Sequence, residues 1–171
     1  MRIGSRLRLS KRRPMFHYPL PRTPRVALLH RGLDYGRSVQ YFDDSSPDFA
    51  KRLTQFRPES FAGSFDQLMR VARANLVRSF DLRAIVVLTA AGSTPLSFTE
   101  RDELWRRFGA PVFEQQLDSG GKLIATECEA HDGLHLLDPS AAPALAPLDH
   151  SQCACGATTP RMKNNRDSAA A

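Results

Sequence analysis

Arg83-Ala-Ile-Val-Val-Leu88, near the middle of this 171-residue chain, is the stretch that decides the fold. It is continuous in apolar residues and rich in β-branched ones, which is typical of a strand covered on both faces within a parallel sheet. Ala90-Ala-Gly-Ser93 follows as a small-residue turn at the carboxyl end of this strand. Nucleotide-type ligands usually bind at that edge of a sheet, so Ala91, Gly92 and Ser93 are candidate cofactor-binding residues. The alternative is a plain tight turn.

One helix is predicted before this strand in the sequence and one after it. Ser64-Phe-Asp-Gln67 and Ser97-Phe-Thr-Glu100 both have the form of a capping box, in which the serine and the residue three positions later each accept a backbone N–H. Apolar residues at helical spacing follow both boxes. In the second helix we expect Leu104, Trp105 and Phe108 to face inward.

Shorter elements complete the pattern. Strands are predicted over residues 25–30, 38–42, 56–62, 111–114, 122–126 and 133–137, with a short helix over 48–54. Strands that alternate with helices indicate an α/β fold, with a mostly parallel sheet and flanking helices. The last two strands form a pair, and we expect a small metal-clipped β appendage there.

All three cysteines of the chain lie in two short motifs around this pair. Cys128-x-x-His131 follows the first strand of the pair, and Cys153-x-Cys155 comes later in the chain. Thiolates and imidazole are the ligands of tetrahedral structural zinc, so Cys128, His131, Cys153 and Cys155 are the predicted metal site. His135 is a rival fourth ligand, but its place in an apolar strand favours a strand-face histidine. The alternative is that the cysteines bind no metal and His131 is solvated in a loop.

The basic charge of the chain is concentrated at its N-terminus. Residues 1–25 contain eight Lys or Arg and no acid, whereas the rest of the chain has 16 basic and 18 acidic residues. The pI of about 9.7 therefore belongs to a tail, which argues against a nucleic-acid-binding face on the folded part. A solvated extension is the favoured interpretation; an arm that binds nucleic acid or anionic lipid, and a transit peptide, are the alternatives.

Domain boundaries follow from these patterns. We expect a basic disordered tail over residues 1–25, an α/β domain over 26–162 with its zinc-knuckle region at 122–161, and a second disordered tail over 163–171.

The sequence has no apolar stretch of about 18 residues, so we expect no membrane partner. An odd number of cysteines, two of them one residue apart, fits a metal site in a reducing cytoplasm better than a disulfide framework.

Motifs spread over residues 56–161 resemble a middle portion of the adenylate-forming, AMP-binding enzymes of the phenylacetate–CoA ligase type. In family order, the segments that carry the resemblance are Arg57-Pro-Glu-Ser-Phe-Ala-Gly-Ser64, Ala90-Ala-Gly-Ser-Thr-Pro-Leu-Ser97, Phe108-Gly-Ala-Pro-Val-Phe-Glu114, Glu127-Cys-Glu-Ala-His-Asp-Gly-Leu-His135 and Cys153-Ala-Cys-Gly-Ala-Thr-Thr-Pro-Arg161. The resemblance implies that the α/β domain is a fragment of an adenylate-forming N-terminal domain. Family activity would be ATP-dependent acid–CoA ligation.

The sequence departs from the family where the chemistry of the family resides. The family's Y-G-x-[ST]-E motif, which holds adenine and helps to bind the metal-nucleotide, is replaced by Gln115-Gln-Leu-Asp-Ser119. No phosphate loop precedes Phe56, the ribose-binding Asp and the adenylating Lys are missing, and the Arg of C-G-R-T is Ala157. Because single charge-stabilising donors are each worth ~10²–10³ in rate, we expect no independent ligase activity.

The sequence therefore predicts a truncated relative of these ligases that holds one structural zinc. ATP or AMP would be a cofactor only if residual family function is retained. The alternatives are a zinc-stabilised protein-interaction module and one half of a split acyl- or aryl-CoA ligase. A complementary ligase chain or another protein is the expected partner, and nucleic acid is not.

Overall fold

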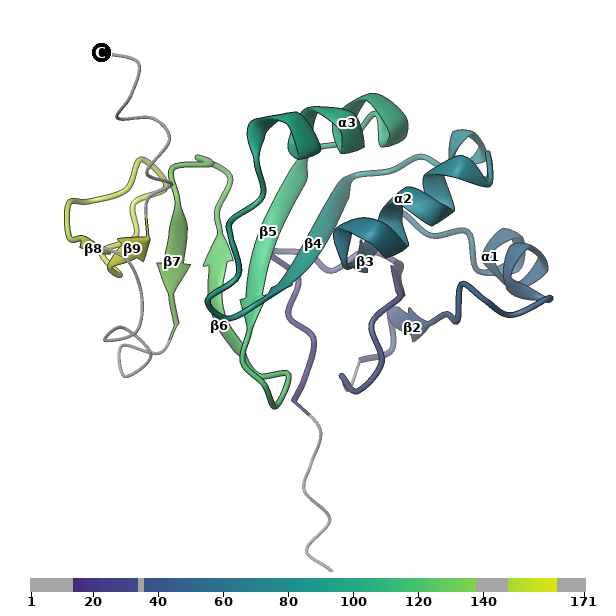
Figure 1. The fold of residues 1–171 in the computed structure, drawn as a ribbon, viewed down its shortest axis with the longest axis horizontal. Coiled ribbons are helices and arrows are strands. Elements are labelled where there is room, and N and C mark those ends of the chain that lie inside the picture. The colour runs from purple at the N-terminus through teal and green to yellow at the C-terminus, as the bar shows by residue number, and fades with distance from the viewer. Residues whose placement is uncertain (1–13, 34–35, 138–147, 163–171) are drawn as a thin grey trace, which may run out of the picture.

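The computed structural model of the chain describes residues 14–33, 36–137 and 148–162. These residues form one nine-stranded sheet in the order β2-β1-β3-β4-β5-β6-β7-β9-β8 (Figure 1). The strands are β1 (Val26–Leu28), β2 (Val39–Tyr41), β3 (Ser60–Gly63), β4 (Ala84–Ala90), β5 (Val112–Leu117), β6 (Leu123–Glu127), β7 (Leu134–Leu136), β8 (Leu148–Asp149) and β9 (Arg161–Met162).

The sheet has a parallel half and an antiparallel half. Strands β2, β1, β3, β4 and β5 are paired in parallel, with β4 inside that half as predicted. From β5 onward every pair is antiparallel: β5 with β6, β6 with β7, β7 with β9, and β9 with β8. This arrangement confirms the predicted α/β fold with a small β appendage at its C-terminal side.

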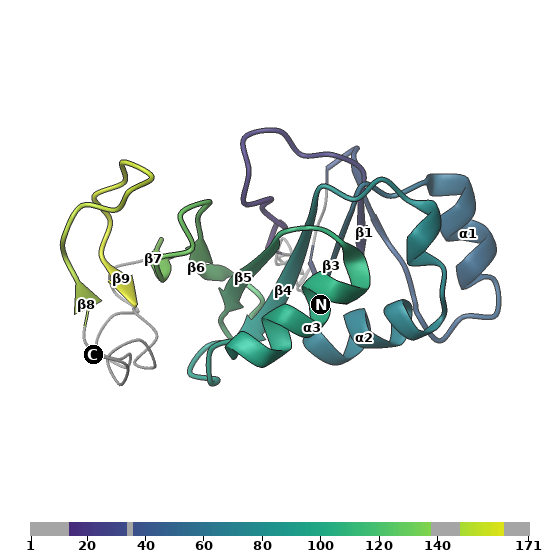
Figure 2. The ribbon, with the colours of Figure 1, turned by 90° about the horizontal axis from the view of Figure 1, so that it is seen from above.

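Helices cover one face of the parallel half. They are α1 (Phe49–Phe56), α2 (Phe65–Arg73) and α3 (Phe98–Phe108), and they share one apolar core with the sheet, built around Phe61, Ile85 and Val87. Figure 2 shows α2 and α3 beneath the sheet and the N-terminal segment, in purple, on the opposite face. No helix of the described residues is long and apolar enough to cross a membrane.

The helices begin where local sequence signals predict, except that the start of α1 and the position of Trp105 differ from expectation. Both predicted capping boxes are present, at Ser64 and at Ser97. The first helix begins at Phe49 with Asp48 as its N-cap, later than the pattern predicts. Trp105 is 57% exposed, because one residue after the buried Leu104 the helix has turned by about 100° away from the sheet. Its predicted inward position is therefore wrong.

Part of the predicted basic tail belongs to the fold. Phe16 is only 7% exposed and packs with Val26, Leu28 and Val86 on the face of the sheet opposite the helices. The reason is that Phe16 supplies apolar surface to a sheet face that the described helices leave uncovered. The structure therefore shifts the boundary at residue 25 toward the N-terminus. Residues 1–13, residues 138–147 and the whole of the predicted tail over 163–171 lie outside the described residues.

Glu114 on β5 ties the turn after β4 to the sheet from a buried position. Its Oε2 accepts the backbone N–H of Leu96 at 2.9 Å, and its Oε1 accepts the Thr89 hydroxyl at 3.1 Å. Desolvation by burial is the largest influence on this carboxyl group and raises its pKa. Because the folded pKa lies above the unfolded one, the contribution to stability is present at acidic pH and is lost as pH rises through the folded pKa.

We therefore expect Glu114→Gln to raise the melting temperature at pH 8 by a few degrees, with the difference shrinking toward pH 4. The amide can still accept from Leu96 and can donate to Thr89, so no hydrogen bond need be lost. Glu103→Gln on the solvent side of α3 is the control, since that side chain is 43% exposed. Thermal melts of the three proteins across this pH range make the measurement. A Glu114→Gln variant with a lower melting temperature at pH 8 than both wild type and Glu103→Gln would show instead that the Glu114 carboxylate is stabilising.

Candidate metal centre

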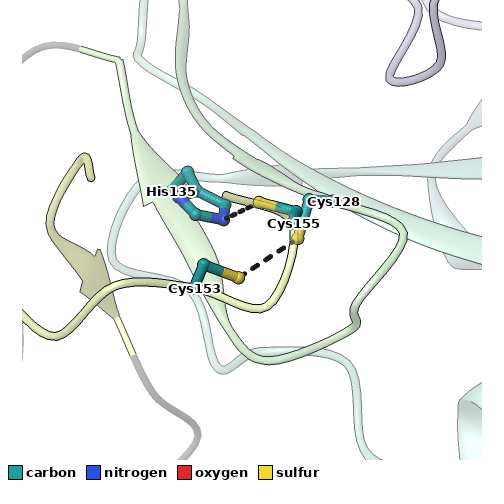
Figure 3. Close-up of side chains that lie close together, drawn as sticks. All are labelled: Cys128, His135, Cys153 and Cys155. Atoms are coloured by element: carbon teal, nitrogen blue, oxygen red, sulfur yellow. Dashed lines mark hydrogen bonds between the residues drawn. The ribbon is translucent and has the colours of Figure 1, made fainter. Parts of the chain in front are cut away.

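Three cysteines and one histidine come together in the antiparallel half of the sheet. Cys128 directly follows β6, and His135 is the central residue of β7. Cys153 and Cys155 lie in the loop between β8 and β9. Figure 3 shows these side chains converging on one another. Their ligand atoms all lie within 4.8 Å of one another.

The spacing of these atoms suits a tetrahedral ion. Cys128 Sγ lies 3.7 Å from Cys153 Sγ, and Cys155 Sγ lies 3.5 Å from His135 Nε2. With metal–sulfur bonds of about 2.3 Å and metal–nitrogen bonds of about 2.0 Å at tetrahedral angles, the sulfur–sulfur separation is about 3.8 Å and the sulfur–nitrogen separation about 3.5 Å. The Cys₃His cluster could therefore hold a metal ion, once the separations that reach up to 4.8 Å shorten by about 1 Å.

A tight turn presents the two thiols of the C-x-C-G motif. The N–H of Gly156 donates to the carbonyl of Cys153 at 2.9 Å, and the N–H of Cys153 donates to the carbonyl of Ala157 at 3.1 Å. Gly156 has φ 88°, a left-handed conformation that other residues resist. A Cβ atom at this position would meet no heavy atom within 4 Å, so the backbone angle rather than lack of space explains the glycine.

His135 is oriented by a neighbour that sequence patterns did not single out. Its Nδ1 lies 2.9 Å from the hydroxyl of Thr159, which leaves Nε2 facing the thiols. Metal-binding histidines usually engage their second ring nitrogen in this way, because the hydrogen bond fixes both the tautomer and the ring plane. Thr159 precedes β9 by two residues, and only the register of β7 against β9 reveals the contact.

His131, the histidine of the predicted ligand set, lies elsewhere. Its Nδ1 is 3.1 Å from Oε1 of Glu127, and its ring packs against that of Phe113 in a tilted arrangement with centroids 4.9 Å apart. The residue sits in a left-handed conformation at φ 51°. This turn directs the imidazole back toward Glu127 and away from the thiols. The structure therefore corrects the fourth candidate ligand from His131 to His135, the rival that the strand pattern disfavoured.

The thiols of the cluster differ in their electrostatics. The backbone N–H of Cys155 has the largest effect on Cys153 and, with smaller contributions, lowers the pKa of Cys153 to about 6. Burial has the largest effect on Cys128 and raises the pKa of that thiol to about 11. Cysteine binds metal as the thiolate, so Cys153 is prepared for binding at neutral pH and Cys128 would release its proton to solvent as the ion binds.

The predicted nucleotide contacts form a turn that is separate from this cluster. Ala91, Gly92 and Ser93 directly follow β4 and are exposed, and Gly92 has φ 74°. The N–H of Ala91 donates to the carbonyl of Leu117 on the neighbouring strand at 2.7 Å. Their role in binding a nucleotide stays a prediction.

Gln115–Ser119, the segment that the resemblance compares with an adenine-binding motif, belongs to a β-hairpin formed by β5 and β6. Gln115 and Gln116 are buried in β5, and Asp118 closes the turn to β6. Oδ1 of Asp118 accepts the N–H groups of Gly120 and Lys122, both at 2.8 Å. The amide of Gln115 donates to the carbonyl of His17 at 3.0 Å. The Gln115 and Asp118 contacts hold the hairpin and the N-terminal segment in place.

The chain matches no protein-family model and no curated protein sequence. Among solved structures it is similar to 2-hydroxyisobutyryl-CoA ligase in an open conformation with 2-HIB-AMP and CoA, with a TM-score of 0.53 and 14% identity over 74% of this chain and 38% of that one. It is also similar to the same ligase in the postadenylation state with R3-HIB-AMP, with a TM-score of 0.51 and 16% identity over 74% of this chain and 37% of that one. The chain thus spans less than half the length of these proteins. At such identity the likeness shows the fold alone, which is similar to that of part of these ligase structures.

Proposed function

We propose that this chain is a degenerate relative of the phenylacetate–CoA ligase type in which one structural zinc ion fastens the C-terminal strands. The observation that carries the proposal is the convergence of Cys128, His135, Cys153 and Cys155 within 4.8 Å. Three thiolates and an imidazole favour zinc over the harder cations, which prefer oxygen ligands. Four protein ligands complete a tetrahedron and leave no open position, as in structural rather than catalytic zinc sites.

The small apolar core of the appendage supports a structural role for the ion. Ala125, Leu134, Leu136 and Met162 are its buried apolar cluster, with Leu148 packed against them. Strands β7, β8 and β9 are only three, two and two residues long. Strand pairs this short are marginal in water without further support. A zinc ion bound between the two cysteine-bearing loops would supply folding free energy that this small apolar core lacks.

The hairpin over Gln115 to Lys122 supports the absence of ligase activity. Catalysis of adenylation depends on charged and polar groups aimed at the transferring nucleotide. At the corresponding place this chain has a glutamine that hydrogen-bonds within the protein and an aspartate that closes a turn. Cofactor use of ATP or AMP is therefore not part of the proposed function of this chain by itself.

We expect the zinc-loaded chain to give no ATP–pyrophosphate exchange above the protein-free background with aryl or short-chain carboxylic acids. An active adenylate-forming CoA ligase assayed beside it serves as the positive control. Exchange that rises with both the acid and the protein concentration would contradict the proposal and would assign the chain an adenylating activity of its own. Parallel metal analysis shows that the assayed protein is loaded.

A further inference from the structure

Arg161 is a fully buried cation beside the metal centre. Its side chain is 1% exposed, although it lies on β9, the second strand from the edge of the sheet. Across the strands, Arg161 lies directly opposite His135 on β7 and directly opposite Asp149 on β8. Directly opposed residues in antiparallel strands point to the same face, with Cβ atoms about 5 Å apart. A candidate ligand, the arginine and an acid therefore form one row.

The guanidinium group joins the two loops that carry the thiols. Nη1 donates to the carboxylate of Asp132 and, at 3.2 Å, to its carbonyl. Nη2 donates to Oδ2 of Asp149 at 2.6 Å and to the Ser151 hydroxyl at 2.9 Å. Asp132 lies between the candidate ligands Cys128 and His135, and Ser151 lies two residues before Cys153. The planar fork thus spans both halves of the cluster, as guanidinium geometry allows and an ammonium group does not.

Stability alone is a poor reason for this arrangement. A buried ion pair often contributes no more than well-packed apolar residues of similar size, since desolvation offsets the attraction between the charges. Nε of Arg161 is also buried without a hydrogen-bond partner among the described residues, which adds a further cost. A role in fixing geometry explains the contacts better, because every partner of Arg161 lies on a ligand-bearing loop or next to one.

We propose that Arg161 is a positioning residue for the metal centre: it ties the Cys128–His135 loop to the Cys153–Cys155 loop and holds the four donors at binding distance before the ion arrives. The inference rests on the proposed zinc site. Without the tie, the ion itself must order the two loops, and the free energy spent on ordering is lost from binding. Removing a group that orients metal ligands typically weakens affinity by roughly 10- to 100-fold.

The test compares the zinc affinity of the full-length wild-type chain with that of Arg161→Met and Arg161→Lys, by competition with a chromophoric chelator. We expect a loss of roughly 10- to 100-fold for methionine and a smaller loss for lysine, which can hold one loop at a time. Cobalt(II) substitution gives a second readout. Wild type is expected to show the intense visible bands of a tetrahedral thiolate site, and Arg161→Met weaker and broader ones. Equal affinity and identical cobalt spectra in all three proteins would overturn the inference.

A second pair of variants decides the question if Arg161→Met does not fold. Asp132→Asn and Asp149→Asn keep the side-chain size at positions that are 47% and 21% exposed. We expect the variant that carries both substitutions to bind zinc several-fold more weakly than wild type. The control variant Asp102→Asn, on α3, is expected to bind zinc as wild type does. A double variant with unchanged affinity would overturn the inference while leaving the zinc site intact. A wild-type chain that takes up no zinc would contradict the proposed site itself, and the inference with it.

Discussion

Cys153→Ser is expected to abolish retention of the metal and to destabilise locally the strands that follow β6. Cys153 is 3% exposed and belongs to both the candidate ligand set and the turn that presents Cys155. A structural zinc site contributes folding free energy directly, so loss of one ligand removes support from β7, β8 and β9 together. The metal content measured after dialysis should fall from about one ion per chain in wild type to near zero in the variant. Hydrogen exchange should rise in β7 to β9 while β1, β3 and β4 stay protected.

The two histidines provide the matched comparison for this result. His135→Ala is expected to lose the metal as Cys153→Ser does, because Nε2 of His135 faces the thiols. His131→Ala is expected to keep the metal, because that imidazole contacts Glu127 and packs against the ring of Phe113. The opposite outcome, with metal lost only from His131→Ala, would restore the ligand set that sequence spacing favours. It would also show that the loop after Cys128 rearranges around the ion.

Phe16→Ala is expected to lower the free energy of unfolding by about 3 kcal/mol or more, the usual range for removing a buried phenylalanine side chain. Phe16 is buried against the sheet face opposite the helices, among Val26, Leu28 and Val86. The neighbouring Met15 is 56% exposed, so Met15→Ala should change stability by less than about 0.5 kcal/mol. Urea denaturation of both variants measures the difference. Equal stabilities would show that the segment before β1 is not part of the core.

Local signals predicted the centre of the fold well. The apolar run over Arg83 to Leu88 specified a doubly covered strand, since burial on both faces suits such a sequence. Two capping boxes fixed the starts of α2 and α3, because the serine and its partner satisfy N–H groups that have no acceptor within the helix. These features depend on residues close in sequence, which is why the sequence alone was sufficient.

Contacts between distant segments were harder to predict. The choice between His131 and His135 depends on the register of β7 against β9, which places Thr159 beside His135 and turns that ring toward the thiols. Spacing from Cys128 carried no such information and favoured the nearer histidine. The burial of Phe16 was missed for a similar reason. It lies among basic residues in the sequence, and it is buried by residues that follow it in the chain, which form the sheet face that the described helices leave uncovered.

The likeness to the solved ligases is one of fold, at 14% and 16% identity, so the phenylacetate–CoA ligase relationship suggested by the motif order stays a prediction. Fold similarity at this level says nothing about the acyl substrate or about ligase chemistry. The metal centre can be assessed independently of descent, because it rests on ligand types and distances in this chain.

Metal content combined with X-ray absorption at the zinc edge tests the central claim most directly. Protein purified without added metal should contain about one zinc per chain, with about three sulfur neighbours at about 2.3 Å and about one nitrogen at about 2.0 Å. Protein with negligible zinc that also fails to take it up, or zinc bound by oxygen and nitrogen alone, would contradict the assignment of a structural zinc site.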